Sequence, residues 1–237
     1  MKLRSRRYRL KESDASYWPS FVDIMTAAVL IFFFIMLISM AISSQFVDNI
    51  SEKREKIYNS IQNNLDKNNV DKNIMHFDRN EGKMVISTET FFDTDKWILK
   101  KDGNDLAKKL NNIFLSLLNE EEIRDEIEYI EIVGHTDYAG DTISNRKLST
   151  ERAMSFLNAM MPMDSELENN YGGKFKASGM SEFETNKNKE DRDRKEYTKS
   201  DMEKTKDQRK IEIKMTFSNK DLEEAIKSKI KKQRGGG

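Results

Sequence analysis

The 237-residue sequence contains no cysteine, only two histidines and two prolines, and its 41 basic and 41 acidic residues cancel. Without cysteine the chain has no disulfide, no thiolate metal site and no thiol nucleophile. Two isolated histidines argue against a histidine-rich metal centre. A net charge of zero argues against nucleic-acid binding, which normally needs a basic excess or a basic face. No Ser–His–Asp set or pair of carboxylates at hydrolytic spacing is recognisable, so we expect neither an enzyme nor a bound cofactor.

One long uncharged run lies between Asp23 and Asp48, and within it residues 24–42 are apolar apart from Thr26 and Ser39. About 20 such residues are needed to cross roughly 30 Å of hydrocarbon. Six cations occur among the first eleven residues, and cations beside a span stay cytoplasmic. The sequence therefore predicts a basic cytoplasmic arm (1–18), a transmembrane helix (19–46) and an exported remainder. A cleaved signal peptide is the alternative, but this run exceeds the usual 7–15 apolar residues.

An acidic residue lies at the cytoplasmic edge of this run. A carboxylate near the middle of a bilayer costs on the order of 2.5–3.5 kcal/mol, and less toward the interface. Asp23 shares one helical face with Thr26, Ala27 and Leu30, and small residues on that face allow a partner helix to approach. Two interpretations stay open. Asp23 either takes up and releases an ion during translocation, or it is an N-terminal helix residue that reaches the headgroups.

Residues 47–74 are predicted to form a polar stem. Its apolar residues recur at near-helical spacing in a narrow stripe, which suits a short two-helix contact better than a globular core. The stem is either a spacer between membrane and domain or a plug that blocks ions before activation. The Asn- and Lys-rich stretch 63–73 indicates a break or linker.

Residues 75–217 alternate between strand and helix patterns, which indicates an α+β domain with one sheet covered by helices on one face. Strands are expected at 84–86, 127–133 and 211–215, and helices at 104–118 and 148–161. A charged insertion at 182–207 contains 17 charged residues in 26. A charged tail follows at 218–234, and the three glycines at 235–237 are taken as a remnant of cloning.

The segment WPSFVDIMTAA at residues 18–28 resembles the single span of MotB-type stator proteins. In that family the aspartate carries the translocated proton or sodium ion, and two B-type spans sit inside a ring of multi-span MotA-type A subunits. The resemblance implies that Asp23, helped by Thr26, translocates ions. It also implies that the chain forms a homodimer inside such a ring, with H⁺ or Na⁺ as the transported ion.

The exported part resembles the OmpA-like peptidoglycan-binding domain. The matching segments are FDTD at 92–95, IVGHTD at 132–137, NRKLSTERA at 145–153 and RKIEI at 209–213. The resemblance implies a mixed sheet with helices on one face, and peptidoglycan binding by Asp137, Asn145, Leu148 and Arg152.

The chemistry of these four residues fits a wall peptide. The carboxylate of Asp137 can hold the ammonium of the diamino acid, and the guanidinium of Arg152 can grip its carboxylate. Asn145 can bond peptide amides. The alternatives are a structural ion pair between Asp137 and Arg152, and a Leu148 that packs its helix onto the sheet. His135 is expected to be a packed residue.

Three functions follow from this sequence. The first is the B subunit of an ion-driven rotary motor that is anchored to the wall, with its N-terminus in the cytoplasm and its C-terminal domain on the outer side of the bacterial inner membrane. The short linker and the insertion favour B-type subunits of Zorya anti-phage systems over flagellar stators. The second is a passive tether between membrane and wall. An enzyme acting on wall glycan is disfavoured because no catalytic set is present.

Overall fold

The structure is a computed structural model that describes residues 18–183 and 199–218. Most of the predicted basic arm, the middle of the charged insertion, the tail and the three terminal glycines lie outside the described residues. By its internal contacts the chain divides into two compact units, residues 1–55 and 56–237, which are described separately.

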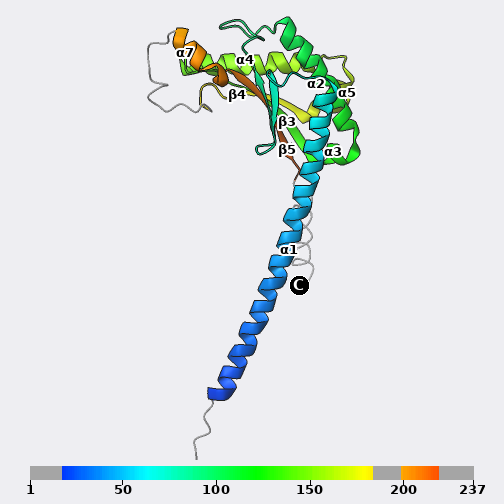
Figure 1. Ribbon diagram of the computed structural model, residues 1–237, viewed down its shortest axis with the longest axis vertical. Helices are drawn as coiled ribbons and strands as arrows, with labels where there is room; N and C mark the ends of the chain where they lie inside the picture. Colours follow the sequence, from blue (N-terminus) through cyan, green and yellow to red (C-terminus); the bar gives the residue numbers. More distant parts are fainter. Residues whose placement is uncertain (1–17, 184–198, 219–237) are drawn as a thin grey trace, which may run out of the picture. The chain divides into compact units, whose positions relative to one another are not determined.

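The first unit consists of the beginning of α1 (Trp18–Lys67), which is drawn in blue in Figure 1. α1 is the one helix of the described residues that is long and apolar enough to cross a membrane, judged by length and composition. α1 runs without a break through the predicted transmembrane helix (19–46) and into the predicted stem helix (47–74). No proline or glycine follows Pro19 before Lys67, so nothing in the sequence ends the helix at the membrane boundary.

The second unit begins with the last turns of α1, and here the predicted stem is corrected. Ile57, Ile61 and Leu65 are buried in the hydrophobic core instead of forming a separate two-helix contact. Tyr58, on the next position of the helix, packs against Phe77 and against Phe217, with ring centroids 5.2 and 6.0 Å away. The folded domain therefore begins near residue 56 and not at residue 75, because these side chains occupy one apolar face of the helix.

The core of this unit is a five-stranded mixed sheet in the order β1-β2-β5-β3-β4. All neighbouring strands are antiparallel except β3 and β4, which are parallel. The predicted mixed sheet is confirmed, and two strands that the sequence pattern did not indicate, β1 and β4, form its edges. The strands are β1 (Met75–Asp78), β2 (Lys83–Ser87), β3 (Ile127–Gly134), β4 (Phe175–Gly179) and β5 (Lys210–Phe217).

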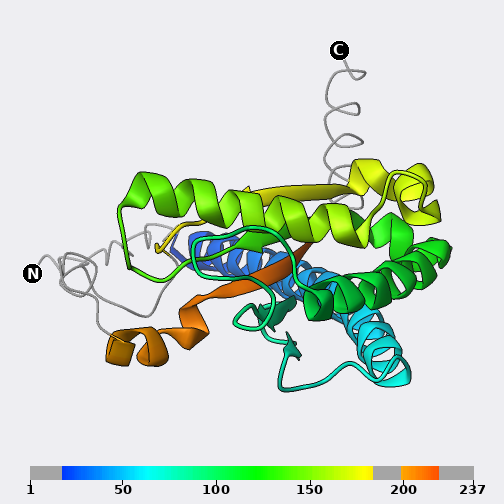
Figure 2. The same ribbon diagram turned by 90° about the horizontal axis from the view of Figure 1, so that it is seen from above.

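Two long helices pack on the sheet and lie side by side in Figure 2. They are α2 (Lys101–Asn119) and α4 (Thr142–Met160), and Asn111 of α2 donates a hydrogen bond to the carbonyl of Met160. Their apolar faces join one core with the inner face of the sheet. The shorter elements are α3 (Glu121–Glu126), α5 (Glu166–Tyr171), η1 (Gly172–Lys174), α7 (Lys199–Lys204) and η2 (Lys206–Gln208).

The alternation that predicted β3 is interrupted at its start. Ile127 pairs with Phe217 and Tyr129 pairs with Thr216, so Glu128 is an extra residue opposite β5. Such a bulge moves one residue out of the strict alternation. Ile127 and Ile130 therefore both point into the core, although the simple pattern places them on opposite faces.

Two glycines let α4 lie directly on the sheet. Gly134 of β3 and Gly179 of β4 are paired neighbours. A Cβ atom on Gly134 would lie 2.0 Å from the carbonyl oxygen of Ser149, and one on Gly179 would lie 2.3 Å from the hydroxyl of Thr150. Only glycine permits this approach. The crossing point fixes the start of α4 at the end of β3, where the predicted binding residues lie.

The outer face of the sheet carries a charged cluster around Glu212 of β5. The Glu212 carboxylate is fully buried and is contacted by Lys210 at 2.7 Å, Lys83 at 3.0 Å and Lys214 at 3.2 Å. His135, also buried, lies 3.4 Å away, which confirms that it is a packed residue. Burial alone would raise the pKa of Glu212, but hydrogen bonds from His135, Lys210 and Lys83 outweigh burial and hold the pKa well below its ordinary value.

Candidate functional site

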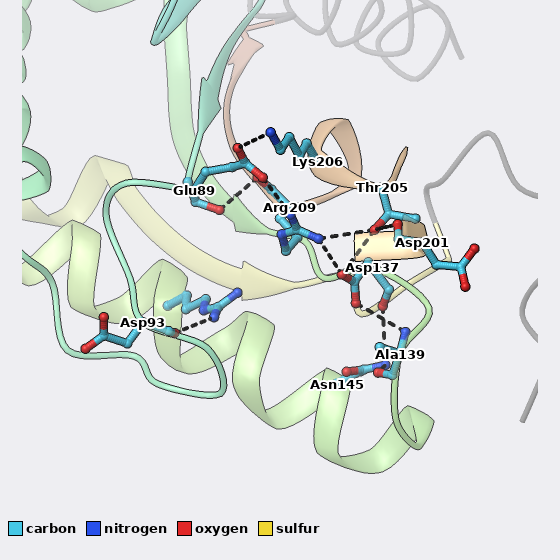
Figure 3. A network of polar contacts seen from close by, with 11 residues as sticks. Glu89, Asp93, Asp137, Ala139, Asn145, Asp201, Thr205, Lys206 and Arg209 are labelled. Atoms are coloured by element: carbon cyan, nitrogen blue, oxygen red, sulfur yellow. Dashed lines mark hydrogen bonds and ion pairs between the residues drawn. The ribbon is translucent and has the colours of Figure 1, made fainter. Parts of the chain in front are cut away.

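Three strand ends converge at one edge of the sheet. β2 and β3 both run antiparallel to β5, so their carboxyl ends lie beside the start of β5. Glu89 follows β2, Asp137 follows β3 and Arg209 precedes β5, and Figure 3 shows these three side chains meeting. They line one side of a cavity of about 560 Å³, and the remaining sides come from the loop 92–95, the loop 136–140 and the first half of α4.

Arg209 joins the two carboxylates on its side of the cavity. Its Nη1 donates to Oδ2 of Asp137 at 2.7 Å, and its Nη2 donates to Oε1 of Glu89 at 2.6 Å (Figure 3). Nη1 also donates to the hydroxyl of Thr205 at 3.1 Å. A planar guanidinium can bridge two acceptors in this way because its donors point in fixed directions.

Both carboxylate oxygens of Asp137 are engaged inside the protein. Oδ1 accepts the backbone N–H of Ala139 at 3.2 Å, and Oδ2 accepts from Arg209 and lies 3.4 Å from the hydroxyl of Thr205. The sequence predicted Asp137 as a holder of a ligand ammonium or as the ion-pair partner of Arg152. Its partner is instead Arg209, so the predicted structural pair between Asp137 and Arg152 is wrong.

The last residues of the charged insertion lie beside this network. Thr205 is held at the end of α7 because its hydroxyl donates to the carbonyl of Asp201 at 2.9 Å. Lys206, at the start of η2, lies 3.7 Å from the other oxygen of Glu89. The described end of the insertion therefore contributes side chains to the site, a role that its charge pattern alone did not indicate.

Arg152 of α4 lies on the opposite side of the cavity and is 6% exposed. Nε and Nη2 donate to the carbonyls of Lys96 and Asp93 at 3.0 and 3.2 Å, and the guanidinium lies 5.2 Å from the ring centre of Phe92. Among the described residues no carboxylate forms an ion pair with it. Burial lowers the pKa of Arg152, partly opposed by the charges of Asp137 and Asp95.

The loop that Arg152 holds brings acidic residues to the mouth of the cavity. Asp93 is paired with Lys100 at 2.6 Å, and the hydrogen bond from Lys100 lowers the pKa of Asp93. Asp95 also lines the cavity and has a left-handed backbone with φ 56°. The cavity lining thus holds four carboxylates, from Glu89, Asp93, Asp95 and Asp137, and two guanidinium groups.

Asn145 and Leu148 have different surroundings: Asn145 is hydrogen-bonded to a loop, and Leu148 lines the cavity. The amide nitrogen of Asn145 donates to the carbonyls of Ala139 at 2.9 Å and Asp137 at 3.4 Å, so this side chain holds the loop 137–139 in place (Figure 3). Leu148 lines the cavity and is not among the buried core residues that pack α4 on the sheet. Asp141 caps α4 by accepting the N–H groups of Ile143 and Ser144.

The predicted ion-carrying residues lie on α1 in the first unit. Asp23 is exposed there, as is Thr26. The hydroxyl of Thr26 donates to the carbonyl of Val22 at 2.7 Å, one turn earlier, so its hydrogen-bond donor is used within the helix. Among residues 18–183 and 199–218 there is no cluster of three His, Asp or Glu side chains that could hold a metal ion.

Sequence reasoning identified the site residues on α4 and after β3, because the motifs there match at many positions within a short segment. It missed Glu89, Thr205 and Lys206. Arg209 was visible only as the first residue of the weak RKIEI match. Arg209 and Glu89 could have been identified from the strand order. Glu89 follows β2, Arg209 precedes β5, and these two strands are neighbours in the sheet.

No protein-family model matches this chain. It is 24% identical over 170 residues to the Zorya protein ZorB of Escherichia coli O139:H28 (strain E24377A / ETEC), covering 70% of this chain and 69% of that protein. A crystal structure of a protein described as MotB-like from Desulfovibrio vulgaris superposes with a TM-score of 0.50 at 18% identity, covering 70% of this chain and 96% of the other.

The periplasmic domain of Helicobacter pylori MotB matches with a TM-score of 0.43 at 13% identity, over 64% of this chain and 85% of that domain. None of these names describes an enzyme. The comparisons therefore show two likenesses: in fold the chain is similar to a MotB-like protein, and in sequence it is similar to ZorB.

Proposed function

We propose that this chain is the wall-anchored B subunit of an ion-driven rotary motor in the bacterial inner membrane, of the ZorB type that serves anti-phage defence. The observation that carries the wall-binding half is Arg152, a buried guanidinium that faces a cavity and has no carboxylate partner among the described residues. A buried charge without a partner is costly, and an anionic ligand group removes that cost.

The diamino acid of a wall peptide fits the charges of this cavity. Its carboxylate would accept from the unused N–H groups of Arg152, while its ammonium would face the acidic residues of the lining. Leu148 and Phe92 supply apolar surface for its methylene chain. Asn145 acts by positioning the loop 137–139. The hydrogen-bond donors that this loop exposes are therefore held in place before the ligand binds.

The motor half rests on Asp23 in a helix of membrane-crossing length. One charge that crosses 100 mV releases about 2.3 kcal/mol, several times the thermal energy. Ion binding at Asp23, beside Thr26, would move a ring of A-type subunits around a dimer of this chain. The wall-bound domain would prevent the dimer from turning. With the N-terminal cations in the cytoplasm, the domain lies on the wall side of the membrane.

Two variants of the full chain test the two halves separately. Purified in detergent, the Arg152→Met variant should lose at least tenfold in co-sedimentation with purified peptidoglycan sacculi, while Asp23→Asn should sediment like the unchanged protein. In cells that carry the neighbouring system genes, Asp23→Asn should keep its expression and membrane assembly but abolish protection against phage, measured as plating efficiency.

Unchanged sedimentation of a folded Arg152→Met variant would contradict the wall-binding proposal. Full protection by Asp23→Asn would remove the motor and leave a passive tether. Loss of swimming instead of loss of phage protection would assign the chain to a flagellar stator.

A further inference from the structure

We infer that Arg209 competes with the ligand for Asp137, so that the wall peptide binds by exchange at a site the protein keeps occupied by its own cation. This inference rests on the proposed function and concerns its regulation. The proposed function requires a carboxylate that holds the ammonium group of the ligand. In this structure that carboxylate already holds a guanidinium, 2.7 Å away.

Both carboxylate oxygens of Asp137 already have partners inside the protein. Arg209 and Thr205 contact one of its oxygens, and the N–H of Ala139 contacts the other. An incoming ammonium would have to share or displace the contact from Arg209. Because Asp137 and Arg209 are both largely shielded from water, with side chains 12% and 18% exposed, this ion pair is screened less than a surface pair.

Arg209 has a second partner to which it can retreat. Its Nη2 donates to Glu89 at 2.6 Å, independently of the bond from Nη1 to Asp137. Release of Asp137 therefore leaves Arg209 paired with the carboxylate of Glu89. An element with two available arrangements is what a ligand needs in order to shift a population.

The competing contact depends on the last residues of the charged insertion. The hydroxyl of Thr205 donates to the carbonyl of Asp201 in α7, accepts from Arg209 at 3.1 Å and lies 3.4 Å from Oδ2 of Asp137, so it packs against both partners. The insertion distinguishes this sequence from the OmpA-like pattern. A change in the position of α7 would therefore alter how tightly Arg209 holds Asp137.

The test uses the full chain in detergent and a soluble disaccharide tripeptide that contains meso-diaminopimelate, with affinity measured by titration calorimetry at 0.3 M salt to screen general charge effects. Arg209→Gln should bind about fivefold more tightly than the unchanged protein, the size expected for loss of one modest ion pair. Thr205→Val, which changes no charge, should shift affinity in the same direction by about twofold.

Lys206→Gln is the matched control because it removes a neighbouring cation that contacts Glu89 but does not line the cavity. Its affinity should change by less than twofold. Equal or weaker binding by a folded Arg209→Gln variant would overturn the inference, as would an equal gain in the Lys206→Gln variant.

If Arg209→Gln does not fold, Thr205→Val decides: tighter binding supports competition, and unchanged or weaker binding overturns it. Failure of the proposed function has a different signature, since the unchanged protein would then not bind the tripeptide at all.

Discussion

Two charged clusters lie in the same domain, and their partners differ. On the outer face of the sheet, Glu212 is surrounded by three lysines and a histidine at 2.7–3.4 Å. In the cavity, Arg152 is equally enclosed but receives only two backbone carbonyls. The first cluster compensates its buried charge within the protein, whereas the second leaves a buried cation that a ligand can neutralise. We therefore expect removal of Glu212 to affect mainly stability, and removal of Arg152 to affect mainly the proposed binding.

The largest effect on stability is expected at Glu212. Glu212→Gln should lower the free energy of unfolding by about 2–3 kcal/mol, because three lysines then lose the carboxylate between them, although Lys83 keeps a second partner, Glu81. This is at or below the roughly 3–5 kcal/mol that breaking a buried pair usually costs, since the lysines are partly exposed. Urea denaturation followed by circular dichroism measures the change. Glu131→Gln, on the same face, is the matched control and should change stability by less than about 0.5 kcal/mol. A loss of similar size in the control would remove the special status of Glu212.

The same cluster should make the domain sensitive to acid. The pKa of Glu212 is depressed in the folded state, so its contribution is present above the ordinary value of 4.5 and is lost as pH falls below it. Stability of the unchanged protein should therefore decline from about pH 4.5 downward, whereas the Glu212→Gln variant should decline less steeply. Denaturation midpoints between pH 3 and 7 measure the two slopes. Parallel slopes would show that other carboxylates govern the acid response.

A small effect on stability is expected at Arg152, in contrast to the large effect expected at Glu212. Arg152→Met removes a buried charge without an ionic partner and keeps an unbranched stem over Phe92. We expect the free energy of unfolding to change by less than about 1 kcal/mol, in either direction, because the lost hydrogen bonds offset the removed burial cost of the charge. Thermal unfolding of the same preparation used for sedimentation measures it. Destabilisation as large as that of Glu212→Gln would make Arg152 a structural residue.

The parts of the fold that the sequence predicted well are those with long, regular periodicity. The strands β3 and β5 and the helices α2 and α4 were all expected, with boundaries that moved by a few residues. β1 and β4 are short edge strands whose patterns are too brief to read. The bulge at Glu128 was invisible because it depends on the partner strand and not on the sequence of β3 alone.

The candidate site was predicted in part. The sequence placed Asp137 and Arg152 in one site, and both line the cavity, but it could not show that Arg209 pairs with Asp137. That contact arises from strand order, which brings residue 209 beside residue 137 across 72 positions of chain. The stem was misjudged for a related reason: a narrow apolar stripe looks the same whether it meets another helix or a sheet.

The entry of α1 into the core bears on how the domain withstands load. Ile57, Ile61 and Leu65 are interior residues, so tension applied through these turns acts directly on the packed centre of the domain. A loop at this position could be stretched or peeled away with little resistance. Here, pulling these turns away from the domain requires the core itself to open, so we expect them to resist load.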